Sequence, residues 1–149
     1  MNAPNETVAK ALQSTLAELI DHALLGKQAH WSVVGPQFRS VHLELDEIVD
    51  LARLSYDRVA ERLATIGVAP DGRAETVAST SELPPFPEGF VPATETVQRV
   101  TQSMDTVAMR MKERIMAIGD DDPVSQDILI GTTDEVEKAA WMLRSQLTM

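Results

Sequence analysis

The chain has 149 residues, of which 44% are hydrophobic and 24% charged, a size and balance typical of one soluble domain with its own core. It contains no cysteine, which excludes disulfides, thiolate metal ligands and a thiol nucleophile. Its formal charge of −10 argues against free nucleic acid as a direct partner, because such binding depends on clustered Lys and Arg.

The first segment with helical periodicity follows Asn5, a predicted N-cap. His30 falls on the continuation of its apolar stripe, so we expect this side chain to point into the protein, and we expect His22 to be a hydrogen-bonded core residue. Gly35 and Pro36 are predicted to end this helix and open the next, with Pro36 at N1. The apolar stripe consists of Val8, Leu12, Leu16, Leu19 and Ala23.

The second predicted helix ends at Gly67 and carries a long apolar stripe. Leu43, Leu51 and Leu54 lie partly off this stripe, and we assign them to a contact with another subunit. The stripe itself consists of Phe38, Val41, Leu45, Ile48, Ala52, Val59, Leu63 and Ile66.

Residues 68–92 include five prolines and form a long connection. A connection of this length is unusual in a compact domain. In a helical bundle it can cross from one end to the other, which is the ferritin-like connectivity. A short helix is expected within it at residues 74–79.

Two more helices are predicted after this crossover, one from N-cap Thr94 to Gly119 and one that begins with Asp122 as N-cap and Pro123 at N1. The methionines of the third helix are interpreted as adaptable core: Met104, Met109, Met111 and Met116. The fourth stripe runs through Ile128, Val136, Ala140, Leu143 and Leu147. The fold predicted for residues 1–149 is therefore a single all-α domain, a four-helix bundle with one long crossover.

Five potential metal ligands lie in and before the second helix. His42 and Asp46 are four residues apart, as are Asp57 and Glu61, so each pair lies on one helix face. The pairs are offset by about 22 Å along the axis and about 60° around it. They therefore face the same way from opposite ends of the helix and cannot share one ion within a chain; His30 is the fifth candidate.

An antiparallel second copy, crossing on a two-fold axis near Leu51 and Ala52, would bring each pair opposite the other pair of its partner. Such an isologous contact creates the site twice. Imidazole and carboxylate ligands suit Fe, Mn, Zn or Co. Several carboxylates around one or two ions also favour a trivalent product, which is a chemical argument for iron.

Two segments resemble the Dps family of ferritin-like mini-ferritins. They are H-W-x-V-x-G-x-x-F-x-x-V-H-x-x-x-D at 30–46 and Y-D-R-V-A-E-R-x-x-x-I-G-x-x-P at 56–70. The resemblance implies a four-helix subunit that assembles as a hollow dodecamer. It also implies that one subunit supplies His30, His42 and Asp46, and that its two-fold mate supplies Asp57 and Glu61.

The activity implied by this resemblance is oxidation of Fe(II), preferentially with hydrogen peroxide, and storage of the ferric product. Two irons per site would each give one electron, so that no hydroxyl radical is released. Trp31 resembles the family's aromatic residue near the iron centre, although simple core packing is the alternative.

Acidic residues outside this centre have two interpretations each. Asp120, Asp121, Asp122 and Asp127 either complement a helix dipole or, by resemblance, line a three-fold pore that attracts cations.

A second acidic group is Glu44, Glu47 and Asp50. These residues either nucleate mineral in the cavity or belong to a solvated helix face.

Family members that bind DNA usually do so through basic tails, and this chain departs from that pattern. Its first thirteen residues carry one basic side chain, Lys10, and its last eleven carry one, Arg144. We therefore expect no direct DNA binding, with bridging by Mg(II) left open. No signal peptide or long apolar stretch is present, which predicts a cytoplasmic protein, with nucleoid association left open and no membrane partner.

Two other functions fit the same residues. Metals bridged by carboxylates also activate water, so an amide or ester hydrolase is one alternative. A DNA-compacting protein with secondary iron chemistry is the other.

Overall fold

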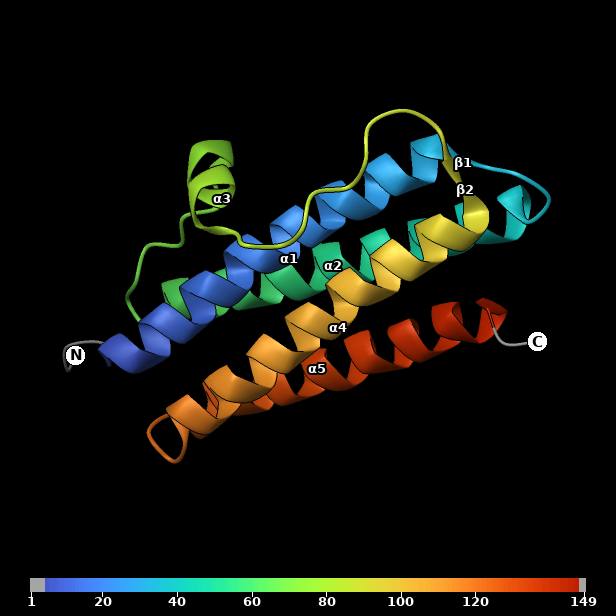
Figure 1. The fold of residues 1–149 in the computed structure, drawn as a ribbon. Coiled ribbons are helices and arrows are strands. Elements are labelled where there is room, and N and C mark those ends of the chain that lie inside the picture. Colours follow the sequence, from blue (N-terminus) through green and yellow to red (C-terminus); the bar gives the residue numbers. More distant parts are fainter. Residues whose placement is uncertain (1–4, 148–149) are drawn as a thin grey trace.

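Four long helices form the body of the molecule, and a short one lies in the crossover (Figure 1). The computed structural model describes residues 5–147. The helices are α1 (Glu6–Ser32), α2 (Phe38–Thr65), α3 (Ala74–Thr80), α4 (Ala93–Ile118) and α5 (Pro123–Arg144), followed by the 3-10 turn η1 (Ser145–Leu147). The predicted all-α four-helix bundle is confirmed.

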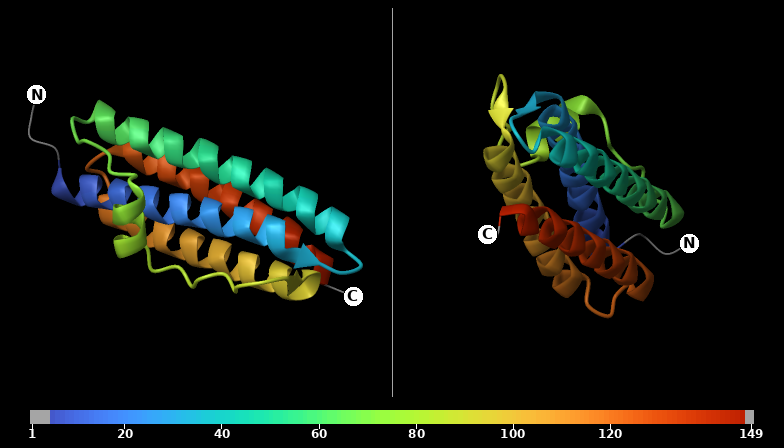
Figure 2. Two further views of the ribbon diagram at one scale, coloured as in Figure 1. Left: turned by 90° about the horizontal axis from the view of Figure 1, so that it is seen from above. Right: turned by 90° about the vertical axis from the view of Figure 1, so that its right-hand side faces the viewer.

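The helices pack as two antiparallel hairpins, α1 with α2 and α4 with α5. The crossover runs back along α1, so that α4 lies beside α1 and runs antiparallel to it (Figure 2). This path is the predicted ferritin-like connectivity.

Local chemistry sets several helix ends as predicted. The Asn5 side chain accepts hydrogen bonds from the amides of Thr7 (2.9 Å) and Val8 (3.3 Å), and Asp122 accepts one from the Ser125 amide (3.1 Å). After α2, Gly67 adopts a φ of 84° that a side chain would disfavour. There its amide and that of the next residue bond back to the last helical turn.

Two predicted helix starts are wrong because of a tertiary contact. β1 (Val33–Val34) pairs in parallel with β2 (Val91–Pro92), in the register Val33↔Val91. This pairing holds the chain extended after α1, and Gly35 then turns at a φ of 113°. Consequently α2 begins at Phe38 rather than Pro36, and α4 begins at Ala93 with Pro92, not Thr94, at its cap.

The crossover is fastened to α1 at two further points. The Gln13 side chain exchanges two hydrogen bonds with the backbone of Asp71 (2.8 and 2.9 Å), and Ser81 donates to Asp21 (2.5 Å). Together with the β1–β2 pairing, these bonds hold the connection along its length.

The core lies between the four long helices and contains most of the predicted stripes. His22 is buried and hydrogen-bonded to Ser103 (2.9 Å), as predicted. Some predicted core residues are instead exposed in the single chain: Phe38, Met109, Met116 and Leu147. Within the described residues, no helix is both long and apolar enough to cross a membrane.

Candidate metal centre

The candidate metal centre begins with two histidines that hold each other in place. His30 lies in the last turn of α1 and His42 in the first turns of α2. His30 Nδ1 lies 2.7 Å from the carbonyl oxygen of His42, and His42 Nδ1 lies 2.8 Å from the carbonyl oxygen of His30. The two rings stack with their centroids 3.6 Å apart. The short α1–α2 connection therefore fixes both rings.

These hydrogen bonds determine which nitrogen of each ring can bind a metal. A carbonyl oxygen only accepts, so Nδ1 of His30 and of His42 must donate its proton. In the neutral ring, Nε2 then carries the free lone pair. Metal-binding histidines commonly donate their other ring nitrogen to a carbonyl in this way, which orients the ring. Both imidazoles are thus prepared to bind through Nε2.

Asp46 lies one turn after His42, and its carboxylate is half-exposed. Its Oδ1 accepts a hydrogen bond from Lys27 Nζ at 2.5 Å and lies 3.4 Å from His30 Nδ1. The Lys27 hydrogen bond is the largest influence on the pKa of Asp46 and lowers it. The carboxylate is therefore ionised near neutral pH and available as a ligand, although Lys27 occupies it in the single chain.

Asp57 and Glu61 lie on the same helix, both exposed to solvent. Eleven residues separate Asp57 from Asp46, which is about 16 Å along an α-helix. Among residues 5–147, no three His, Asp or Glu side chains are gathered closely enough to hold a metal ion. The structure places His30 beside His42 and beside Asp46, but these three side chains do not form a metal site within one chain, and Asp57 and Glu61 lie apart from them.

Exposed apolar side chains include a contact of His42 and the sequence neighbours of both histidines. Phe38 packs against the His42 ring with centroids 4.8 Å apart, yet it remains partly exposed, as does Leu43. Trp31, next to His30, is 65% exposed, so core packing within the subunit does not explain it. Large apolar side chains beside a half-formed site indicate a surface that another molecule covers.

The acidic residues predicted for mineral nucleation separate into two groups. Glu44 and Glu47 line a groove between α2 and α5 together with Glu135 and Lys138. Burial, followed by the charge of Glu47, raises the pKa of Glu44. Asp50 is not part of this groove; it pairs with Arg53 on the exposed side of α2.

Glu135 and Lys138 were not predicted as part of any site, because nothing in their local sequence links them to Glu44. Their place in the groove depends on the packing of α5 against α2. Lys27 was missed for a similar reason, since its contact with Asp46 joins two helices.

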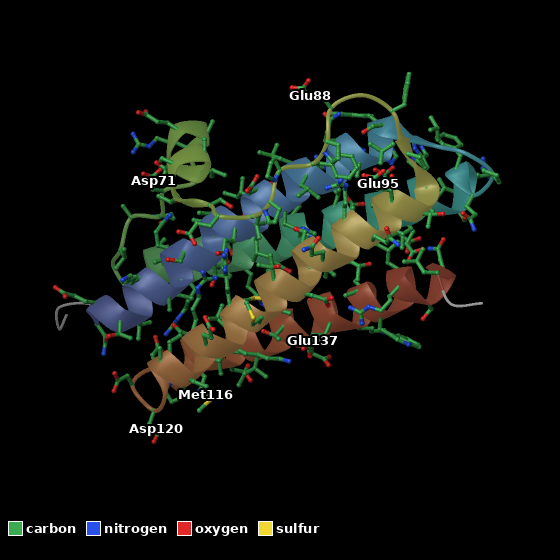
Figure 3. All side chains as sticks on the ribbon, viewed as in Figure 1. Asp71, Glu88, Glu95, Met116, Asp120 and Glu137 are labelled. Atoms are coloured by element: carbon green, nitrogen blue, oxygen red, sulfur yellow. The ribbon has the colours of Figure 1, made fainter. Side chains whose placement is uncertain are left out.

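The acidic turn before α5 also divides by role. Asp122 caps α5, and both of its carboxylate oxygens accept hydrogen bonds from Arg62 Nη2 (2.9 Å each). Asp121 accepts a hydrogen bond from Asn5 (3.0 Å). Asp120 lies at the tip of the turn and points away from the bundle (Figure 3). Asp120 and Asp127 are exposed, so they are better placed than Asp122 to meet a passing cation.

Comparison with known proteins gives a consistent result. A family model described as a ferritin-like domain matches residues 9–149. The chain is 37% identical over 145 residues to the fine tangled pili major subunit of Haemophilus ducreyi, covering 97% of this chain and 77% of that protein. It is 35% identical over 138 residues to DNA protection during starvation protein 2 of Deinococcus radiodurans, covering 93% of this chain but only 57% of that longer protein.

Solved structures agree with these sequence relatives. Dps92 from Deinococcus radiodurans superposes with a TM-score of 0.92 at 34% identity, covering 94% of this chain and 85% of that one. Dps from Microbacterium arborescens, solved in a high iron form, gives a TM-score of 0.89 at 28% identity, with 96% of each chain covered.

Proposed function

Because the chain belongs to the Dps family of ferritin-like mini-ferritins, we propose that it oxidises Fe(II) with hydrogen peroxide, or with O2, and stores the ferric product in a hollow dodecamer. The oxidation centres lie between two subunits related by a two-fold axis. Each centre takes two iron ions as substrate.

One observation supports this proposal: the candidate ligands lie in two groups near opposite ends of α2. His30 and His42 offer Nε2 and Asp46 offers an ionised carboxylate at the first end. Asp57 and Glu61 supply two more carboxylates at the second end. An antiparallel partner would complete the ligand set twice.

The ligand set suits the proposed reaction. Two imidazoles and three carboxylates bind Fe(II), and the carboxylate charge stabilises Fe(III) further. Each of two Fe(II) ions gives one electron to hydrogen peroxide. The O–O bond breaks, and two protons are taken up to form two waters and two Fe(III). Because both electrons are delivered within one site, no hydroxyl radical is released.

Storage follows from the acidic surfaces. Glu44 and Glu47, with Glu135 beside them in the α2–α5 groove, are suited to bind Fe(III) and start mineral growth. Asp120 and Asp127, with Asp121, would attract Fe(II) at the pore.

Protection of DNA is the consequence for the cell. Two of the relatives are named DNA protection during starvation proteins. The charge of −10 opposes direct binding to a phosphate backbone. We therefore assign protection to the removal of Fe(II) and peroxide, and we expect no retardation of DNA in a gel at low salt.

Mixing two inactive variants tests the shared centre. His42→Ala with Asp46→Ala removes one half of the centre, and Asp57→Ala with Glu61→Ala removes the other. Each variant should assemble but lose rapid peroxide-dependent oxidation. Unfolding and refolding the two together should restore about a quarter of the wild-type rate, because half of the dimers are mixed and each has one intact site.

Two results would contradict the proposal. Full activity of either variant alone would show that the residues are not ligands. Mixed assemblies without regained activity, with subunit exchange verified by native mass spectrometry, would show that the centre is not shared.

A further inference from the structure

The outer face of α2 carries polar residues in a palindromic spacing. The intervals between them are 4, 4, 3, 4 and 4 residues, and the sequence of intervals reads the same from either end. The residues are His42, Asp46, Asp50, Arg53, Asp57 and Glu61. The midpoint of every symmetric pair falls between Leu51 and Ala52, so a two-fold axis at that point pairs each residue with its counterpart.

The outer pairs of this palindrome are the candidate ligands, and the central pair is Asp50 with Arg53. Their side chains are 72% and 53% exposed, and they lie 3.8 Å apart within one chain. An exposed ion pair of this kind contributes little to the stability of a single subunit. Neither residue is accounted for by the fold of the monomer.

We infer that Asp50 and Arg53 of two subunits form a four-charge cluster on the two-fold axis, in which each Asp50 meets the partner's Arg53. The inference rests on the proposed shared centre, because it uses the same antiparallel contact. The cluster adds an attraction between opposite charges of the two subunits that the metal ligands themselves do not provide.

The position of the pair supports this arrangement. Both residues are about 2 Å from the midpoint along the helix axis, and they lie on the same face as the ligand pairs. Leu54, adjacent to Arg53, is 74% exposed in the single chain, and Leu43 lies further along this side. Covering these leucines removes water from the contact, and charges buried there require partners.

The cluster would also fix the register of the two helices. If one helix slid by about a turn, Asp50 would face the partner's Asp57 or the partner's Asp50 instead of an arginine. Only the register centred between Leu51 and Ala52 joins opposite charges at the centre and the two halves of the metal site at the ends. Asp50 is thereby a positioning residue of the interface, distinct from Glu44 and Glu47 in the groove.

Charge reversal tests the cluster. Asp50→Arg gathers four cations at the axis, and Arg53→Asp gathers four anions, so each variant should weaken the dimer at least tenfold and slow iron oxidation accordingly. The double variant Asp50→Arg with Arg53→Asp restores two charges of each sign and should regain both properties. Mixing the two single variants should also restore assembly, because the mixed dimer has a balanced cluster.

A matched control is Arg99→Asp on α4. Arg99 forms an ion pair of similar exposure with Glu95 in its own helix, and its reversal should leave the α2 dimer intact. Dimer dissociation is measured by sedimentation and oxidation by stopped-flow absorbance. Thermal unfolding monitored by circular dichroism checks that each subunit folds.

The outcomes separate this inference from the shared centre. Single reversals that dimerise like the wild type, or a double variant and a mixture that both fail to recover, would overturn the charge cluster. The ligand-mixing experiment keeps Asp50 and Arg53 unchanged, so it reports on the metal centre independently. If the ligand-mixing experiment fails while the charge-reversal double variant recovers, the charge cluster at the interface is supported and the shared metal site is not.

Discussion

Lys27 Nζ lies 2.5 Å from Asp46 Oδ1, so an ammonium group contacts the carboxylate that we propose as a metal ligand. The hydrogen bond from Lys27 is the main reason for the lowered pKa of Asp46, and the neighbouring histidines add to it. An incoming cation must therefore displace a positive charge that belongs to the same subunit. We therefore predict that Lys27 affects how readily the proposed centre binds a metal ion.

Lys27→Met should strengthen binding of a divalent cation. The substitution removes both the competing hydrogen bond and the repulsion of the cation, an effect of up to about 1 kcal/mol, or about fivefold, for a partly exposed pair. Calorimetric titration with Co(II) measures it, because Co(II) is not oxidised under these conditions. Lys27→Arg retains the charge and serves as the control. Weaker Co(II) binding by the methionine variant would mean that Lys27 orients Asp46 for the metal.

His22 predicts a loss of stability in acid. Burial lowers the pKa of His22 to about 4, from an ordinary value of 6.5. Between these values the unfolded chain binds a proton that the folded chain does not, so stability falls as the pH drops from 6.5 towards 4, by up to about 3 kcal/mol. His22→Gln cannot titrate and should flatten this part of the profile. Urea unfolding at pH 7.5 and 5 gives the free energy of unfolding of the wild type and of the variant. An equal loss of stability between these pH values in both proteins would contradict the prediction.

Asp122 and Asp127 should respond differently to the same substitution. Burial opposes the ionisation of Asp122, but hydrogen bonds from Ser125 and Arg62 outweigh it and lower its pKa. Asp122→Asn keeps a side-chain oxygen that can cap α5 but removes the charged partner of Arg62, so unfolding should become easier by about 1–2 kcal/mol. Asp127→Asn should leave stability unchanged and slow iron uptake into the assembled shell. An unchanged uptake rate in the Asp127 variant would count against a role in the pore.

Glu44 and Glu47 should affect mineral growth without affecting the first oxidation step. Replacing both with Gln removes two carboxylates from the α2–α5 groove and leaves the histidine half-centre intact. We expect a normal initial burst of oxidation followed by slower growth of the ferric core. Because the pKa of Glu44 is raised, its carboxylate takes up a proton at a higher pH than an ordinary glutamate does. As the pH is lowered, the wild-type growth rate should therefore begin to fall at a higher pH than expected for an ordinary glutamate. Light scattering follows the core, and an unchanged growth rate would exclude the groove as a nucleation site.

Helix ends were predictable where neighbouring residues determine them. Asn5 and Asp122 cap the helices that follow them, and Gly67 ends α2, because each acts on backbone groups within four residues. Pro36 and Thr94 misled the prediction because the β1–β2 pairing joins residues 58 positions apart. A two-residue strand has too little pattern to reveal itself in sequence.

The candidate site was predictable to the same extent. Helical spacing shows that His42 goes with Asp46, since both lie on one helix. The mutual hydrogen bonds of His30 and His42 depend on how α1 and α2 pack, as does the contact of Lys27 with Asp46. Sequence therefore suggested the candidate ligands, whereas the tautomers of the two histidines and the contact of Lys27 with Asp46 required the fold.

The fastening of the crossover has a practical consequence for the intact molecule. Its start is bonded to Gln13, its middle to Asp21, and its end pairs through β2 with β1. A protease that cleaves between Ser81 and Val91 would cut one peptide bond without freeing either hairpin. The nicked protein should migrate as two fragments under denaturing conditions and as a single species when native. Because α2 is not cut, the candidate ligands at both of its ends should remain in place.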